Sequence, residues 1–193
     1  MKEIILIGGG GHCKSVIDVI EQEGRFEIVG IVDKPKLLGS NVLGYSVIGS
    51  DFDLDSLAKK YQYALITVGQ IKSPSLRIKL FDLAVKAGFT LPNIISPNAY
   101  VSRHSSIGNG VVVMHNAIVN ASASIGDNCI INSKALIEHD VVIKNHCHIS
   151  TGSIVNGGAL IKNRVFFGSN STTREGVIIE SDLVFGAGSL ILK

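Results

Sequence analysis

Residues 119–149 read VNASASIGDNCIINSKALIEHDVVIKNHCHI, and an aliphatic residue recurs in this stretch at every sixth position. The same period extends from Ile95 to Ile191, and sixteen of the seventeen positions on it are apolar, the exception being Thr173. The residue four positions after each aliphatic one is nearly always small, as at Ala135. A period of six, held without slippage over about a hundred residues, predicts a solenoid of short strands and tight turns in which each coil buries its interior against the next.

A different pattern occupies the chain before this repeat. Ile4–Ile7 is followed by four glycines and then by apolar residues at helical spacing, and two further apolar runs end at Asp33 and Gly69. Strands that alternate with helices indicate a small parallel α/β sheet. Residues 1–94 carry 11 basic and 10 acidic residues, whereas residues 95–193 carry only 7 and 6. We therefore predict an α/β domain over 1–94 and an all-β solenoid over 95–193.

The composition excludes several classes of protein. With 193 residues, of which 46% are apolar and 18% charged, the chain is too hydrophobic to be disordered. Every apolar run is nevertheless broken well before the roughly 18 residues of a spanning helix, so no membrane span is expected. Eighteen basic against sixteen acidic residues, without a basic cluster, indicate no nucleic-acid partner. The short apolar N-terminal run and only three cysteines favour a cytoplasmic protein over a secreted one.

The glycines at 8–11 lie between the first predicted strand and the first predicted helix. A dinucleotide fingerprint requires a third glycine, but Cys13 and Lys14 occupy the two positions where it would fall, so a nicotinamide cofactor is not expected. Backbone N–H groups at a helix N-terminus nevertheless suit a phosphate group. A phosphate site and a turn that serves only strand–helix packing both remain open.

The order of parts in the chain carries a resemblance to known enzymes. The repeat resembles the hexapeptide-repeat acyltransferases, whose left-handed parallel β-helix takes three hexapeptides per coil. GGGGHCK at 8–14, followed by the α/β half and by IEHDV at 137–141 and NHCHIS at 145–150, resembles more specifically the sialic acid O-acetyltransferase and UDP-amino-sugar N-acetyltransferase family. The resemblance implies a Rossmann-like N-terminal domain, a left-handed parallel β-helix, and acetyl-CoA as co-substrate.

Among the six histidines, His139 differs from the others in two respects. It lies between Glu138 and Asp140, so a carboxylate can hold the imidazole in one tautomer and raise its basicity. With three hexapeptides per coil, Gly157 lies on the next coil about 4.8 Å away, where its N–H can stabilise an oxyanion. The resemblance implies that His139 is the general base and Asp140 its partner.

The resemblance also implies the residues that contact acetyl-CoA, namely His148, Gly157, Ser169 and Ala187. His148 follows His139 by half a coil, so the two side chains lie on opposite sides of the coil. We therefore expect a homotrimer whose active sites lie between neighbouring chains, with His139 from one chain and His148 from the next. His146 and His148 lack a third metal ligand at matching spacing, so no metal is expected.

For the sugar nucleotide, the resemblance implies the glycine turn and the end of the second strand. The residues are Gly10, Gly11, His12, Cys13, Asp33 and Lys34. The expected activity is transfer of an acetyl group from acetyl-CoA to the amino group of a UDP-linked amino sugar, in the biosynthesis of a bacterial surface glycan or glycoprotein. Two alternatives remain, namely O-acetylation of a sialic-acid-like sugar and a non-catalytic β-helix that binds a nucleotide sugar.

Overall fold

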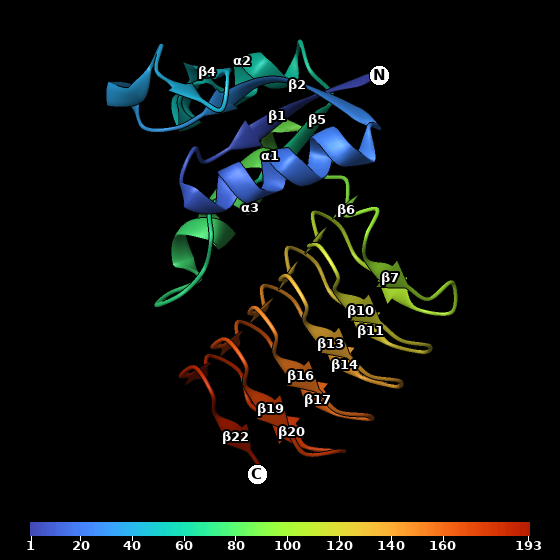
Figure 1. The fold of residues 1–193 in the computed structure, drawn as a ribbon. Helices are drawn as coiled ribbons and strands as arrows, with labels where there is room; N and C mark the ends of the chain where they lie inside the picture. The colour runs from blue at the N-terminus through green and yellow to red at the C-terminus, as the bar shows by residue number, and fades with distance from the viewer. The chain divides into compact units, whose positions relative to one another are not determined.

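The computed structural model describes every residue from 1 to 193, and its contacts divide the chain into two units (Figure 1). The first unit comprises Met1–Gly69 and Ser75–Ile94, and the second comprises Gln70–Pro74 and Ile95–Lys193. The segment 70–74 precedes the predicted boundary at 94/95 but packs with the repeat, because the Gln70 side-chain amide donates a 3.0 Å hydrogen bond to a backbone carbonyl there.

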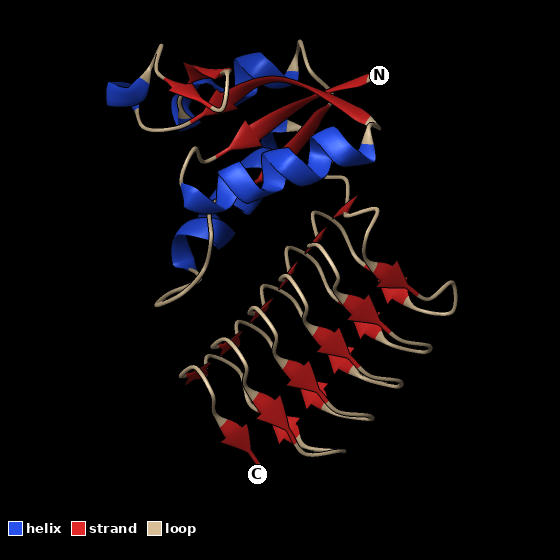
Figure 2. Ribbon diagram, viewed as in Figure 1, coloured by secondary structure: helices blue, strands red, loops and turns tan.

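The first unit is built on a five-stranded sheet in the order β3-β4-β2-β1-β5 (Figures 1 and 2). Neighbouring strands run parallel except for the antiparallel pair β3 and β4. The strands are β1 (Lys2–Ile7), β2 (Phe26–Val32), β3 (Asn41–Val42), β4 (Tyr45–Gly49) and β5 (Tyr63–Ile66). The helices are α1 (Gly11–Glu23), α2 (Leu54–Ala58) and α3 (Ser75–Ala87), with two short 3-10 helices, η1 (Pro35–Leu37) and η2 (Asp51–Asp53).

The apolar pattern of the first 24 residues explains the centre of this unit. Ile4–Ile7 of β1 are buried, and β1 is an inner strand that pairs with a strand on each side. Helix α1 buries Val16, Ile17 and further apolar residues at helical spacing, which is how an amphipathic helix covers a sheet. The helix ends at Gly24, whose φ of 67° lets its N–H bond the Ile20 carbonyl. The predicted sequence of strand, glycine turn and helix is confirmed.

The second unit consists of three parallel sheets of two-residue strands, each named here after its first strand (Figures 1 and 2). The β6 sheet contains β6 (Ile94–Ile95), β9 (Val112–Val113), β12 (Ile130–Ile131), β15 (His148–Ile149), β18 (Phe166–Phe167) and β21 (Val184–Phe185). The β7 sheet contains β7 (Tyr100–Val101), β10 (Ile118–Val119), β13 (Leu136–Ile137), β16 (Ile154–Val155), β19 (Thr172–Thr173) and β22 (Leu190–Ile191). The β8 sheet contains β8 (Ser106–Ile107), β11 (Ser124–Ile125), β14 (Val142–Ile143), β17 (Leu160–Ile161) and β20 (Ile178–Ile179).

The hexapeptide period has a direct structural cause. The second residue of each strand, as in Ile137, points inward, and the small residue immediately before each strand, as in Ala135, also faces the interior. Each strand pairs with the strand one coil later, as Ile118 does with Leu136. Most turns between strands place one residue near φ +60°, and asparagine, aspartate or glycine often occupies that place because these residues tolerate it best. The predicted β-helix is therefore confirmed.

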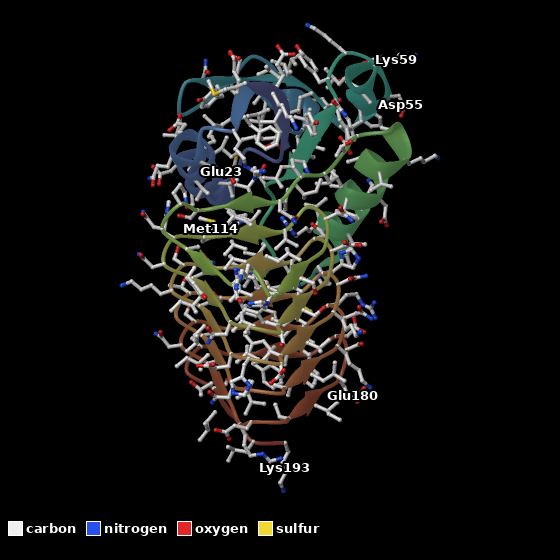
Figure 3. All side chains as sticks on the ribbon, turned by 90° about the vertical axis from the view of Figure 1, so that its right-hand side faces the viewer. Glu23, Asp55, Lys59, Met114, Glu180 and Lys193 are labelled. Atoms are coloured by element: carbon white, nitrogen blue, oxygen red, sulfur yellow. The ribbon has the colours of Figure 1, made fainter.

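Charged side chains lie on the outside of the coils. Figure 3 shows Glu180 on the outer surface near the C-terminal end, where its carboxylate pairs with Lys162 of the preceding coil at 2.7 Å. None of the helices is long and apolar enough to cross a lipid bilayer. The longest, α1 and α3, have 13 residues each, against the roughly 20 that a bilayer requires.

Candidate active site

The turn that joins β13 to β14 presents a histidine followed by an aspartate. His139 and Asp140 are its two central residues, and Asp140 has a φ of 60°, a conformation that a short polar side chain tolerates. The Asp140 carboxylate turns toward the preceding side chain, so that its Oδ2 lies 2.8 Å from Nδ1 of His139. Both side chains are about two-thirds exposed, at 66% and 64%. The turn therefore presents an oriented imidazole to solvent.

This hydrogen bond determines which nitrogen of His139 can act as a base. A carboxylate accepts a hydrogen bond from the N–H at Nδ1, so the neutral imidazole carries its hydrogen on Nδ1 and leaves a lone pair on Nε2. The hydrogen bond to Asp140 also raises the pKa of His139 above its ordinary value, and the negative charge of the nearby carboxylates adds to the effect. The result is an oriented base of increased strength.

The second flanking carboxylate has a different role. Oε2 of Glu138 accepts a 2.8 Å hydrogen bond from the side-chain amide of Asn120 on the preceding coil and a 3.3 Å bond from the backbone N–H of His139. Glu138 therefore holds the backbone of the turn, while Asp140 holds the ring. The carboxylate that bonds the imidazole is thus Asp140, the residue that the family resemblance implies.

Gly157 lies against the imidazole of His139, as the stacking of coils predicts. A β-carbon at position 157 would lie only 2.9 Å from Cε1 and 3.0 Å from Nε2 of His139. No protein group accepts a hydrogen bond from the Gly157 N–H. At another corner of the coil the corresponding N–H groups are occupied, because Asp127 N bonds the side-chain oxygen of Asn145, and Asn145 N bonds that of Asn163. The Gly157 N–H is thus a free donor beside the base.

His148 lies on another side of the coil. His139 follows a strand of the β7 sheet, whereas His148 is the first residue of β15 in the β6 sheet. His148 is only 5% exposed, and its ring nitrogens lie 2.5 Å from the Gln70 carbonyl and 3.1 Å from Nδ2 of Asn132. Its edge also contacts the Phe166 ring, at 5.2 Å between centroids. Within one chain the two histidines are therefore not brought together.

The remaining residues predicted to contact acetyl-CoA fall into two groups. Gly157 is at the corner between the β7 and β8 sheets, beside His139. Ser169 and Ala187 are at the corner between the β6 and β7 sheets, stacked on successive coils. Ser169 Oγ lies 3.2 Å from Ser150 Oγ, which follows the strand that carries His148. Ser169 and Ala187 thus lie toward His148 and away from His139.

Three residues around His148 were missed by reasoning from sequence. Asn132 and Ser150 follow β12 and β15 in the same column of the repeat, so the eighteen-residue stacking could have placed them together. Gln70 lies in the segment 70–74 outside the repeat, and no periodic signal points to it. No group of three or more histidine, cysteine, aspartate or glutamate side chains is arranged to hold a metal ion.

The glycine turn of the first unit forms an open helix N-terminus. Gly10 is the N-cap residue of α1 and supplies no side-chain cap, so the first N–H groups of the helix have no capping acceptor. A β-carbon at Gly10 or Gly11 would meet no atom within 4 Å, which shows that the space beside the turn is open. This arrangement suits a phosphate group.

Asp33 holds this turn against the end of β2. Its Oδ2 accepts a 2.6 Å hydrogen bond from Gly9 N, and its Oδ1 accepts a 2.7 Å bond from Lys34 N. Beside it is a small pocket of about 80 Å³ at the carboxyl ends of the strands, lined by Ile7, Gly8, Val32, Asp33, Lys34, Asp51, Val68, Leu76 and Leu80. In parallel α/β sheets this edge is the usual ligand site. The predicted residues Asp33 and Lys34 both line the pocket.

Cys13 differs from the other predicted residues of the turn. Its side chain is fully buried, and burial, the largest cause, raises the pKa of its thiol to about 11. The expectation that Cys13 contacts a substrate can therefore apply only to its backbone N–H, because the thiol belongs to the core. His12 is half-buried at the first turn of the helix, and its Cβ packs near Gly69.

Known protein families and solved structures share this architecture. The PglD N-terminal domain family matches residues 3–82, and the bacterial transferase hexapeptide family (six repeats) matches residues 104–139. One similar solved structure is a histidine-to-asparagine variant of perosamine N-acetyltransferase from Caulobacter crescentus, in complex with CoA and GDP-perosamine. Its sequence is 33% identical to this chain, and the TM-score is 0.92. The match covers 100% of this chain and 90% of that one.

Two structures of another relative agree with this match. The acetyltransferase domain of PglB from Neisseria gonorrhoeae is 31% identical with a TM-score of 0.92, covering 100% of this chain and 92% of that one. The same domain in complex with acetyl coenzyme A is 30% identical with a TM-score of 0.90, covering 98% and 92%. A search among curated proteins gave no match.

The fold and the exposed histidine–aspartate pair define a hexapeptide-repeat acyltransferase. The chain belongs to the left-handed β-helix acyltransferase family, among its sugar N-acetyltransferases. The enzyme class predicted from the sequence, an acetyl-CoA-dependent sugar N-acetyltransferase, is confirmed at this level.

Proposed function

We propose that the protein transfers the acetyl group of acetyl-CoA to the amino group of a nucleotide-linked amino sugar, in the assembly of a bacterial surface glycan or glycoprotein. The contact between the Gly157 backbone and the oriented imidazole of His139 carries the proposal, because it places a base and a free N–H donor side by side. The open helix N-terminus at Gly10 and the adjoining pocket supply a site for the nucleotide in the first unit.

The reaction follows from these groups. Nε2 of His139 takes a proton from the sugar amine as its nitrogen attacks the thioester carbonyl. The resulting tetrahedral oxyanion accepts a hydrogen bond from the Gly157 N–H. When the intermediate collapses, the C–S bond breaks, the amide forms, and the CoA thiolate receives the proton held by the imidazole. Asp140 stabilises the imidazolium formed between the two proton transfers.

Substitution of the base tests this assignment. We expect His139→Ala to reduce kcat by about 10²-fold to 10⁴-fold, the usual contribution of a general base. His104→Ala is the control, because His104 is exposed on a surface turn where its Nε2 accepts a 3.1 Å hydrogen bond from Nε of Arg103. CoA release from acetyl-CoA is measured with a panel of amino-sugar nucleotides. Absence of release with every acceptor would favour the non-catalytic β-helix instead.

The nucleotide is proposed to be UDP, because the sequence resembles the UDP-amino-sugar enzymes. GDP is the second candidate, since one solved relative was crystallised with GDP-perosamine. A nucleotide that binds only the native state increases the free energy of unfolding, by about 2.7 kcal/mol at a concentration a hundredfold above Kd, and so raises the melting temperature. Thermal shifts with UDP, GDP and CMP therefore rank the nucleotides, and no shift with any of them would favour O-acetylation of a free sugar.

A homotrimer is proposed to complete the active site. Outward-facing residues of the β7 sheet are apolar and exposed in a single chain, with Tyr100 at 59%, Ile118 at 38% and Leu190 at 67%. A second copy that covers this sheet would bring His148, Ser169 and Ala187 of one chain toward His139 of its neighbour. Mixing His139→Ala chains with His148→Ala chains should then restore about a quarter of the sites, because random trimers unite one intact copy of each histidine at that frequency. No recovery of activity would reject a shared site.

The reaction is proposed to take place in the cytoplasm. Cys13, Cys129 and Cys147 are all free thiols and buried. Thiols without disulfides agree with a reducing compartment.

A further inference from the structure

Thr173 is the polar exception in the column of aliphatic residues that fills the β7 sheet. It is the second residue of β19, points into the coil, and is only 1% exposed. The other inward residues of this sheet are Val101, Val119, Ile137, Val155 and Ile191. A buried hydroxyl in an apolar column requires a hydrogen-bonding partner.

That partner is Asn156, on the preceding coil. Elsewhere in the β7 sheet, the N–H that follows a strand donates to the backbone carbonyl of the inward residue one coil later, as Glu138 N does to Val155 O at 3.0 Å. Asn156 N donates instead to the hydroxyl of Thr173 at 2.9 Å, and the carbonyl of Thr173 accepts a 2.6 Å bond from the Asn156 side-chain amide. A pair of side-chain bonds has replaced one rung of the backbone ladder.

The ladder is correspondingly shorter at this place. Strands β16 and β19 pair only through Ile154 and Thr172, whereas β13 with β16, and β19 with β22, each keep two pairs. The irregularity lies immediately before Gly157. Gly157 is the residue whose backbone lies against the His139 ring.

The residue before Gly157 is held on three sides. Thr173 fixes the N–H and the side chain of Asn156, and the Asn156 carbonyl, which belongs to the Asn156–Gly157 peptide, accepts a 3.3 Å bond from Ala159 N. The other polar group of this peptide is the Gly157 N–H, which has no partner in the protein. Because a peptide is planar, fixing one side of it also fixes the direction of the N–H on the other.

We propose that Thr173, acting through Asn156, is a positioning residue that aims the Gly157 N–H at the reacting carbonyl. The inference rests on the proposed function, in which this N–H stabilises the oxyanion. It assigns Thr173 no contact with substrate. It explains why the only polar residue of the aliphatic column stands one coil beyond Gly157.

Thr173→Val tests the proposal, because valine keeps the shape of threonine, suits the aliphatic column and removes the hydroxyl. We expect kcat to fall by about tenfold, a fraction of what loss of a whole oxyanion donor costs. The KM for acetyl-CoA should stay within about twofold, and the acidic limb of the pH profile should not move, because His139 and Asp140 are untouched. Thr173→Ser retains the hydroxyl and should restore most of kcat.

Two further variants separate positioning from packing and from the catalytic assignment. Ile191→Val trims the same column one coil later, away from Asn156, and should leave kcat unchanged even if the melting temperature falls. A Thr173→Val enzyme with wild-type kcat, or equal losses in the Val and Ser variants, would overturn the proposal. If His139→Ala abolishes turnover while Thr173→Val keeps the wild-type kcat, only this inference fails. If His139→Ala is fully active, the proposed function fails.

Discussion

Two adjacent glycines, Gly157 and Gly158, allow the catalytic contact to be separated from the stability of the turn. At Gly157 the backbone is not in the left-handed region, but a β-carbon would lie 2.9 Å from Cε1 of His139. At Gly158 the φ is 67°, but a β-carbon would meet nothing within 4 Å. Alanine at the first position therefore creates a contact problem, and alanine at the second creates backbone strain.

The magnitudes follow from these geometries. Carbon atoms pack at about 3.5 Å or more, so Gly157→Ala must displace the exposed imidazole by about 0.5 Å. A misplacement of about 1 Å at a reacting group can cost a hundredfold in rate, so we expect kcat/KM to fall between about tenfold and a hundredfold. The left-handed conformation costs alanine about 1 to 2 kcal/mol, and each kcal/mol lowers the melting temperature of a chain of this size by about 2 to 4 °C.

The assay compares both variants by steady-state release of CoA and by thermal unfolding. Gly157→Ala should lose activity and keep its melting temperature, whereas Gly158→Ala should lose several degrees and keep its activity. Full activity in Gly157→Ala would refute the contact between the glycine and the base. Equal loss of activity in both variants would show instead that the whole turn is disturbed.

Three further results are expected. Asp140→Asn removes the carboxylate that raises the pKa of His139, so the acidic limb of the pH profile of kcat/KM should move to lower pH, and kcat should fall. An acidic limb that stays in place would contradict the assignment of the base. Asp33→Ala removes the acceptor of the Gly9 N–H, so the rise in melting temperature produced by nucleotide should shrink; an unchanged rise would separate this carboxylate from nucleotide binding. The buried Cys13 thiol has a pKa of about 11, so only about one part in a thousand is thiolate at pH 8. It should therefore resist a thiol reagent until the protein unfolds. Rapid labelling of the native protein would show instead that the thiol is accessible.

The repeat made much of the β-helix predictable. Because every coil must place an aliphatic residue and a small residue at the same points of its interior, a period of six is visible without any structure. Stacking then relates each residue to the one eighteen positions later, and this relation placed Gly157 beside His139. It also showed that His148 lies on a different side of the coil.

Side-chain choices within that frame do not follow from the period. Glu138 and Asp140 flank His139 equally in sequence, and Asp140 was expected as the partner only through the family resemblance. In the structure Asp140 bonds the ring from a left-handed backbone, while Glu138 bonds Asn120. Thr173 appears in the sequence as an irregularity of the period, and its bonds to Asn156 become visible only when the two coils are stacked.

Contacts from outside the repeat depended on tertiary structure alone. The Gln70 carbonyl bonds the His148 ring from a segment that carries no period. Cys13 turns its thiol into the core although it follows an exposed glycine turn. Sequence by itself determined the β-helix and the stacking of its coils, because a repeat imposes the same burial requirement many times over. Tertiary structure decided the orientation of single side chains and the packing of the 70–74 segment, because each depends on one local arrangement that no other part of the chain repeats.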